Sequence, residues 1–247
     1  MKKYFPLIAL FLSLMVIVSC NREDAPDCIQ SGGTESSEYR ELAPFSRIEL
    51  RDYIHYELIQ ADKYSVEIRG PGNLLNDITT EVRDGKLLVS NANTCNFVRS
   101  FRRKIYVRIA APTFGEIEHY ASGNVSALDT IRQSRFVMNF RHATGEVNLL
   151  MHCDTVSLFM HTGSADCNVS GEAETTELFA NGLGFLDAYS LTSRNLFVNH
   201  SSIQPLKASV SDYLFCLIGS RGDVILNRAP STMDIQDEGL GNLVFLD

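Results

Sequence analysis

Residues 145–163 read GEVNLLMHCDTVSLFMHTG: a glycine, a short apolar run, and a second short apolar run before the next glycine. The same unit recurs from residue 123 onward. Its glycines are separated by 22, 18, 21, 38 (two steps of 19) and 19 residues, at Gly123, Gly145, Gly163, Gly184, Gly222 and Gly241. Helical repeats need about thirty residues or more, so this shorter period indicates stacked turns of β-strand or leucine-rich units. The sequence therefore predicts a solenoid of about six turns, or rungs, over residues 123–247.

The second apolar run of each unit places a leucine beside a phenylalanine. Written in register, four such runs are Val156-Ser157-Leu158-Phe159-Met160, Thr176-Glu177-Leu178-Phe179-Ala180, Arg194-Asn195-Leu196-Phe197-Val198 and Asp212-Tyr213-Leu214-Phe215-Cys216. Because side chains alternate across a strand, the leucines share the uniformly apolar face of each run, which must be the inward face. The pattern predicts an inward leucine column and an outward phenylalanine column, formed by Phe159, Phe179, Phe197 and Phe215.

The outward phenylalanine column is the candidate contact stripe of this sequence. Neighbouring strands lie about 4.8 Å apart, so four rings at equivalent positions would extend over roughly 15 Å. Three interpretations stay open: the rings pack on one another or beneath the N-terminal arm, they join two copies of the chain, or they bind an extended apolar or glycan ligand.

Short alternating strands also fill the N-terminal half, from Phe45 to Phe114. Segments such as Ile54-His55-Tyr56-Glu57-Leu58 and Ile105-Tyr106-Val107-Arg108-Ile109 have the period of two that indicates a half-buried strand. Glycine and proline punctuate them, as in Gly70-Pro71-Gly72. No window of about ten residues or more has helical periodicity. The pattern predicts an all-β protein.

A series of motifs then follows in a defined order. They are Phe45-Ser46-Arg47-Ile48, Tyr64-Ser65-Val66-Glu67-Ile68-Arg69-Gly70, Asp84-Gly85-Lys86-Leu87, Val107-Arg108-Ile109-Ala110-Ala111-Pro112 and Ala121-Ser122-Gly123-Asn124-Val125. Over residues 44–247 this order resembles the head GIN domain family of putative auto-transporter adhesins. Ala121 stands where that family has the first glycine of a Gly-Ser-Gly turn. The resemblance implies a right-handed parallel β-helix, with rungs of about 20 residues, in a bacterial lipoprotein.

The first residues have the composition of a targeting segment. Lys2 and Lys3 precede an apolar run of 15 residues, which is short for a membrane-spanning helix. Ile17-Val18-Ser19-Cys20 resembles a lipobox, which implies cleavage before Cys20 and acylation of that cysteine, although an ordinary secretory signal stays an alternative. We therefore expect a lipoprotein signal peptide at 1–19, a flexible tether at 20–43, and one β-helix domain at 44–247, with irregular coils at 44–116 and regular repeats at 117–247.

The mature chain is acidic. Removing Lys2 and Lys3 from 22 basic residues leaves 20 against 30 acidic residues, a formal charge of −10. Such a chain repels a phosphate backbone, so nucleic acid is not an expected partner. The basic cluster at 99–104 could contact anionic headgroups or acidic glycans, but a solvated loop is the simpler interpretation.

Five cysteines remain if Cys20 is acylated, and an odd number cannot pair completely. The cell envelope permits disulfides. One candidate pair joins Cys28 in the tether to Cys95 in a loop; the alternative is that all five are reduced. No cysteine or histidine spacing of the zinc type occurs.

Catalytic patterns are missing from the aligned runs. Parallel β-helices include polysaccharide lyases and hydrolases, but a fold does not decide an activity. Hydrolysis needs two carboxyl groups at a defined separation. In the expected register no two consecutive rungs present carboxylates, and Asp166 and Asp187 have no charged partner at matching positions. We expect no catalytic residue, metal or cofactor.

Two further patterns have ordinary explanations. His142, His161 and His200 end successive second runs, but their registers differ by one or two residues, which favours solvated turn histidines over a metal site. Arg221-Gly222-Asp223 spells an integrin-recognised tripeptide, yet the repeat already requires a glycine there.

The sequence predicts a non-enzymatic, adhesin-like lipoprotein of the cell envelope, in the outer membrane, with surface exposure and a periplasmic location both left open. Its expected contacts are the membrane, through the lipid anchor, and a protein or glycan partner. The segment 241–247 looks like a last partial rung, whose edge could pair with another copy to form a homodimer. Two alternatives stay open: a polysaccharide-processing enzyme, and an envelope-stress or regulatory accessory lipoprotein.

Overall fold

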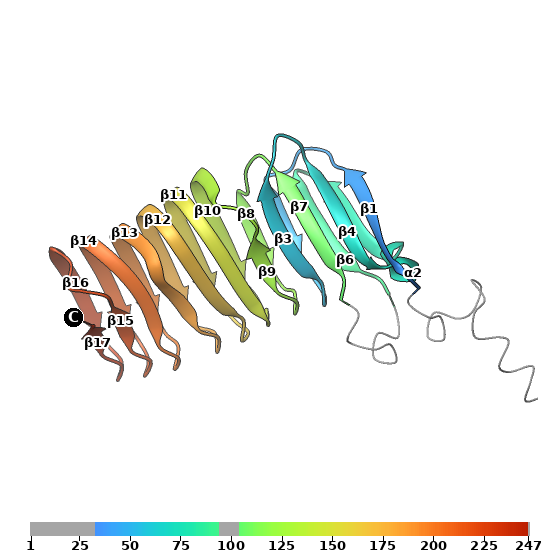
Figure 1. The fold of residues 1–247 in the computed structure, drawn as a ribbon. Helices are drawn as coiled ribbons and strands as arrows, with labels where there is room; N and C mark the ends of the chain where they lie inside the picture. Colours follow the sequence, from blue (N-terminus) through green and yellow to red (C-terminus); the bar gives the residue numbers. More distant parts are fainter. Residues whose placement is uncertain (1–32, 94–103, 247) are drawn as a thin grey trace, which may run out of the picture.

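The computed structural model describes residues 33–93 and 104–246, and its regular structure is almost entirely β-strand (Figure 1). The strands are β1 (Glu35–Glu41), β2 (Arg47–Leu50), β3 (His55–Gln60), β4 (Ser65–Pro71), β5 (Ile78–Arg83), β6 (Lys86–Asn91), β7 (Tyr106–Ala111), β8 (Glu116–His119), β9 (Val125–Ala127), β10 (Ile131–Phe140), β11 (Glu146–Met160), β12 (Asp166–Ala180), β13 (Leu186–His200), β14 (Leu206–Ile218), β15 (Val224–Leu226), β16 (Thr232–Asp237) and β17 (Leu243–Phe245). One short helix, α2 (Gly72–Leu75), lies among the described residues. A search of this part of the chain for helices long and apolar enough to cross a membrane found none.

The regular half is a parallel β-solenoid of about six turns, as predicted. Each long strand from β11 to β14 contributes a first run and a second run to one rung. The division is visible at the next rung, where β15 pairs with the first run of β14 and β16 pairs with its second run. The partial rung expected at the end of the chain is β17, which pairs with β15. We call the two outer surfaces the first-run face and the second-run face.

Glycine is required at most of the turns because successive turns stack at backbone contact distance. A Cβ atom added to Gly184 would lie 1.8 Å from the carbonyl oxygen of Ala165. At Gly163 the corresponding distance to the carbonyl oxygen of Ala143 is 2.3 Å, and the φ angle is +104°, which favours glycine. The glycine period of the sequence therefore records the close stacking of the turns.

The N-terminal half has a different strand order in space than in sequence. β2 pairs with β6 on one side and with β8 on the other, while β3 pairs with β7 and β9. The rung made of β2 and β3 is thus enclosed between two rungs that the chain forms later. Antiparallel pairs then close this end of the solenoid, with β4 on β7, β1 on β4 and β5 on β6 (Figure 1).

Part of the expected tether belongs to this N-terminal cap. Residues 35–41 form β1 and pair over seven positions with β4, so the flexible segment predicted at 20–43 is too long at its C-terminal end. Arg40 fixes the strand by donating hydrogen bonds to the carbonyl oxygen of Ile78, at 2.6 Å, and to Thr80 Oγ1, at 3.0 Å. Composition misses this strand because backbone pairing with an existing edge needs no apolar side chains.

The interior is apolar, but its columns differ from the predicted register. Leu158 lies beside Leu178, as expected, whereas Leu178 lies beside Val198 and not beside Leu196. The predicted leucine column is therefore wrong after its second member. Two mixed columns replace it: Leu158, Leu178, Val198 and Cys216 in one, and Val156, Thr176, Leu196 and Leu214 in the other. All eight side chains are buried, so the prediction of an inward face is confirmed.

Candidate functional site

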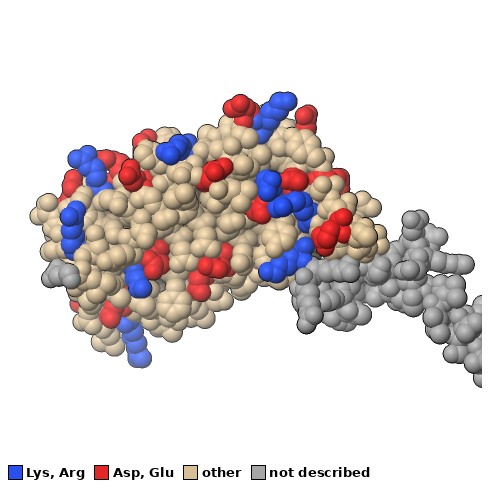
Figure 2. Space-filling model, in the orientation of Figure 1, with Lys and Arg blue, Asp and Glu red and all other residues tan. Residues whose placement is uncertain are grey.

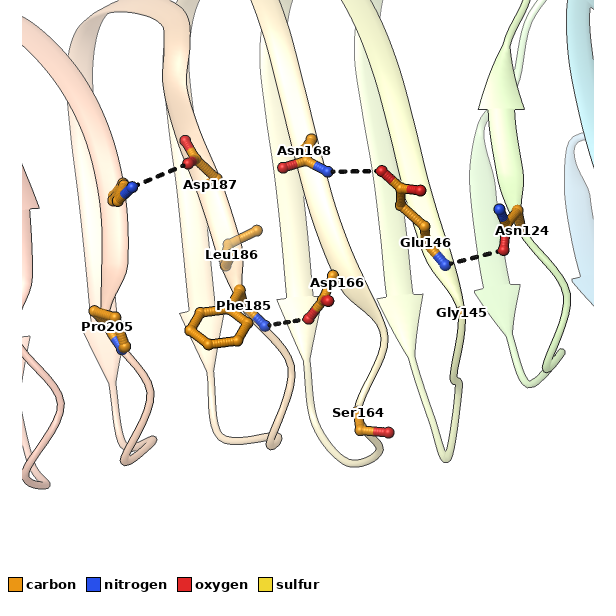
Figure 3. Close-up of a pocket in the computed structure, with 11 residues that line it drawn as sticks. Asn124, Gly145, Glu146, Ser164, Asp166, Asn168, Phe185, Leu186, Asp187 and Pro205 are labelled. Carbon is orange, nitrogen blue, oxygen red and sulfur yellow. Dashed lines mark hydrogen bonds and ion pairs between the residues drawn. The ribbon is translucent and has the colours of Figure 1, made fainter.

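A shallow polar depression on the first-run face is the candidate site, and we call it the groove (Figure 3). Two outward columns form it, one on each side of the inward residues that open β11 to β14. Asn148, Asn168, Asp187 and Lys207 occupy equivalent positions on successive rungs. Glu146, Asp166, Phe185 and Pro205 line the depression nearer the glycine turns. Parallel strands at a constant spacing thus repeat hydrogen-bonding groups along the solenoid.

Hydrogen bonds between rungs hold these polar groups in place. Asn168 Nδ2 donates to Asn148 Oδ1 at 3.2 Å and to Glu146 Oε1 at 3.4 Å. The backbone N–H of Phe185 donates to Asp166 Oδ1 at 2.9 Å. These bonds fix the orientation of the carboxylate and amide groups before any ligand arrives.

The groove extends along the solenoid axis. Its main depression encloses about 590 Å³, and a neighbouring depression encloses about 350 Å³. The two share Asn168 and Asp187, so together they form one continuous surface across several rungs. The ring of Phe185, 47% exposed, lines it, and the exposed Tyr189 follows Asp187 on the same strand. An aromatic ring beside amides and carboxylates can stack on one side of a ligand while hydrogen bonds hold its edge.

The carboxylates of the groove are placed differently from the sequence-based prediction. Glu146 and Asp166 are directly paired on consecutive rungs, contrary to the expectation that no consecutive rungs present carboxylates. Asp187 also has a charged partner, because Lys207 Nζ lies 3.7 Å from its Oδ2 atom. The prediction aligned only the second runs, so it missed pairings between the first runs. Each of these carboxylates already accepts a bond or an ion pair from a neighbour, which suits binding better than proton transfer.

The four phenylalanines of the predicted stripe lie on the outward second-run face, but in two pairs. Phe159 is beside Phe179, and Phe197 is beside Phe215, while Phe179 is beside Asn199. The second pair is therefore displaced by two residues along the strand, and the predicted continuous column is wrong. Phe197 is 40% exposed and the other three rings are half-buried.

Neighbouring rings cover each phenylalanine pair in part. The His161 ring centroid lies 5.4 Å from that of Phe179 and 6.4 Å from that of Phe159. Tyr213 packs on Phe197 with a centroid separation of 5.8 Å. Contacts of this kind contribute about 0.5–1.5 kcal/mol per pair. They favour packing as the role of these rings.

Charged residues gather farther along the second-run face, on β2, β6 and β8, as a network of ion pairs. Glu49 binds both Arg51 and Lys86, and Arg141 Nε lies 2.8 Å from Glu118 Oε2. Burial alone would raise the pKa of Glu49, but hydrogen bonds from Lys86 and Arg51 outweigh it and lower the pKa. Figure 2 shows the same mixture over the visible surface, where acidic and basic side chains are interspersed. This network resembles a structural lattice of paired charges more than a binding site.

The histidines do not form a metal site. His200 is completely buried and occupies an inward position, beside Ala180 and Ile218, so its prediction as a solvated turn residue is wrong. Burial lowers its pKa. His142 is exposed and His161 half-buried, both outside the core. Within residues 33–93 and 104–246, no group of three or more histidine, cysteine, aspartate and glutamate side chains could hold a metal ion.

The Arg221-Gly222-Asp223 tripeptide is part of a stacked turn. Gly222 is buried there, and a Cβ added to it would lie 2.2 Å from the carbonyl oxygen of Gln204. Asp223 Oδ1 accepts the backbone N–H of Asn242 at 2.8 Å. The aspartate therefore holds the next turn.

Other predicted site residues fall in two classes. Cys20, Cys28 and Cys95 lie outside the described residues, and so does most of the basic cluster at 99–104. Cys153, Cys167 and Cys216 are free thiols buried in the core. The predicted site residues did not include Phe185, Asn168 or Lys207. Aligning the first runs on their inward apolar residues, and not on the glycines, would have brought all three into register.

Comparison with known proteins gives the relationships of the chain. A search of curated proteins gave no match. The solved structures with this fold include a "putative adhesin" from Bacteroides fragilis, with a TM-score of 0.78 and 16% identity over 86% of this chain and 97% of that one. A "putative adhesin" from Parabacteroides distasonis has a TM-score of 0.69 and 16% identity over 87% and 98% of the two chains. A "putative lipid binding protein" from the same species gives 0.64, with 16% identity and the same coverage.

Those structural likenesses, at low identity, concern the fold alone. The sequence relationship is more specific, because one family model matches residues 44–230, well over half of the chain. On this match the chain belongs to the family described as "Putative auto-transporter adhesin, head GIN domain".

Proposed function

We propose that this protein is a lipid-anchored, non-enzymatic adhesin-like protein of the bacterial cell envelope, and that its groove contacts an extended glycan. The groove carries the proposal. It repeats amide and carboxylate groups along successive rungs and places the exposed Phe185 ring beside them. A sugar offers hydroxyl groups at its edge and an apolar C–H face, which match these two kinds of surface.

The shape of the groove favours a polymer over a compact ligand. Enclosed ligand pockets bury most of a small molecule. Here the two depressions are open and joined through Asn168 and Asp187, so a ligand would lie along the surface. The charge of the lining favours a neutral glycan over an acidic one, because Glu146, Asp166 and Asp187 outnumber the lining cation, Lys207.

Glycan binding can be tested with soluble protein that begins at residue 21. The protein is applied to a panel of neutral and acidic polysaccharides, and affinity for a retained glycan is measured by calorimetry. We expect Phe185→Ala and Asn168→Ala each to weaken binding by about tenfold, equivalent to about 1.4 kcal/mol. Phe197→Ala is the matched control, since it removes a ring of similar exposure, 40% against 47%, from the second-run face. Equal losses in Phe185→Ala and Phe197→Ala would refute the groove as the site.

The same panel tests the enzyme alternative. Incubation of the retained glycan with the protein should release no new reducing ends or unsaturated products. Release that depends on Glu146 or Asp166 would replace the binding proposal with a catalytic one.

The lipid anchor is a separate part of the proposal, based on the lipobox that ends at Cys20. Two acyl chains suffice for stable membrane attachment without a spanning helix. We expect the full chain to sediment with outer membranes and Cys20→Ala to become soluble. A Cys20→Ala chain that still sediments with membranes contradicts the anchor. Cys28→Ala is the control that keeps the lipobox.

A further inference from the structure

The C-terminal end of the solenoid leaves its core open. Met233 and Ile235 on β16 occupy inward positions, next to Leu214 and Cys216 of the preceding rung. Leu214 and Cys216 are fully buried, but Met233 is 45% exposed and Ile235 is 38% exposed. Both side chains have the orientation of core residues, and no rung among the described residues covers them. The last rung therefore presents apolar interior surface to the outside.

Backbone groups are open at the same end. Among the described strands, β16 pairs only with β14, and β17 pairs only with β15. Both strands lie at this end of the solenoid (Figure 1), so their outer edges present N–H and C=O groups that no described strand pairs. Native proteins usually block such edges with charged side chains, above all lysine, with proline or with a covering segment. Neither strand contains proline or lysine, and their charged residues are Asp234 and Asp237 of β16.

The N-terminal end differs in both respects. Antiparallel strands close it, and α2 buries Leu74 and Leu75 against the core. Its outermost strand, β1, has the sequence Glu-Ser-Ser-Glu-Tyr-Arg-Glu, which is polar and charged. Stacking of a C-terminal end on an N-terminal end would therefore pair an apolar surface with a charged cap. Pairing of two C-terminal ends instead places apolar surface against apolar surface.

We propose that the C-terminal end binds the C-terminal end of a second copy of this chain. A twofold axis between them sets each exposed edge against an edge of the partner in antiparallel direction and covers Met233 and Ile235 of both copies. Such an interface uses the same patch twice and closes at two copies, so it forms dimers and not fibres. Exposed charges of both signs surround the end, at Asp234, Asp237, Glu238, Arg221 and Arg228, so like copies need not repel.

This pairing extends the proposed function. Its orientation relative to the membrane rests on the proposed lipid anchor. The described chain begins at the closed end, beside α2, and finishes at the open end (Figure 1). If Cys20 carries lipid, the paired ends lie away from the membrane, and the two anchors lie at opposite ends of one doubled solenoid. Two copies on facing membranes could then connect those membranes directly.

Solution mass tests the pairing. Soluble chain beginning at residue 21 is measured by sedimentation equilibrium up to about 100 µM, well above the 1 µM dissociation constant of a weak specific dimer. We expect a monomer–dimer equilibrium that Ile235→Lys weakens at least tenfold. Met233→Lys, which adds a charge at the other inward position of β16, should weaken it also. Leu183→Lys is the control, because Leu183 is an exposed apolar residue, at 61%, that lies in a turn on the side of the solenoid. Circular dichroism melts verify that each variant is folded.

A monomer at all concentrations, or a dimer that both Ile235→Lys and Met233→Lys leave intact, overturns the inference. A second measurement separates the inference from the anchor. Vesicles in two colours, each carrying the lipidated full chain, should cluster with one another, and Ile235→Lys vesicles should not. A solution dimer without clustering supports the end pairing and refutes the anchored arrangement. Loss of glycan binding in Phe185→Ala is independent of both results.

Discussion

Protonation of a buried histidine should make the stability of this protein depend steeply on pH. His119 is completely buried on β8, between Leu50 of β2 and Phe140 of β10. Its ring packs edge to face on Phe140, with centroids 5.6 Å apart. Neither ring nitrogen has a hydrogen-bond partner among the residues that the structure describes. Burial therefore lowers the pKa of His119 from 6.5 to about 4.

The sign and size of the effect follow from proton linkage. Below pH 6.5 the unfolded chain takes up a proton at this position, whereas the folded chain stays neutral until about pH 4. The unfolded state binds more protons in this window, so stability falls as the pH is lowered through it. Between pH 7 and pH 4.5 the loss assigned to His119 is about 2.5 kcal/mol, from the two pKa values.

The experiment compares the native chain with His119→Phe, which fills the same space without a titrating group. Free energies of unfolding are measured by chemical denaturation at pH 7 and pH 4.5. The native chain should lose about 2.5 kcal/mol more than the variant over this interval. His142→Asn is the control, because His142 is exposed and has a φ angle of +58° that asparagine tolerates. The same pH dependence in the native chain and His119→Phe would refute a neutral, buried His119.

Three other changes test the packing. Gly171→Ala should lower the free energy of unfolding by about 3 kcal/mol or more, because a Cβ would lie 1.9 Å from a backbone carbonyl oxygen at a φ of +113°. Gly85→Ala, in open space at a φ of +70°, should lower it by about 1 kcal/mol. Equal losses in chemical denaturation would contradict the stacking of the turns. Leu158→Ala should cost about 2–5 kcal/mol, and a loss under about 1 kcal/mol would show that the column is loosely packed. Cys153, Cys167 and Cys216 should react with a thiol reagent only after unfolding, in a chain whose other cysteines are replaced by serine. Burial raises the pKa of each of these thiols, that of Cys216 to about 12. Rapid labelling of the folded chain would contradict their burial.

Much of the fold could be predicted because it depends on short-range rules. A glycine whose Cβ would overlap the preceding turn, such as Gly184, recurs at every turn but one between Gly123 and Gly241, so the period appears directly in the sequence. Alternation likewise separates inward from outward residues. The order of the N-terminal rungs could not be predicted, because nothing local to β2 and β3 indicates which later strands will enclose them.

The predicted register failed for a related reason. Shifting a strand by one residue exchanges its two faces, but shifting it by two residues preserves them. The Leu-Phe pair at 196–197 is displaced by two residues from the pair at 178–179, so both registers bury their leucines. The apolar pattern therefore cannot distinguish them. An irregularity between Asn168 and Ser170 accompanies the change, and it leaves no signal in a single sequence.

The candidate site was harder to predict than the fold. The phenylalanines predicted a contact stripe because they are large and recur, but they pack with His161 and Tyr213. The groove consists mainly of small polar residues, and such residues predict only the solvated side of a strand. Asn168 becomes a site residue only when the register places it beside Asn148 and Asp187.

The enclosed position of β2 and β3 gives the two ends of the protein different histories during folding. In a simple repeat array each unit can add to the one before it, and terminal units can be removed one at a time. Here the first rung to be synthesised has no neighbour until residues 86–91 and 116–119 arrive on either side of it. The N-terminal half must therefore assemble as one cooperative block after most of it has been synthesised. The rungs that follow can then be added, and lost, in sequence.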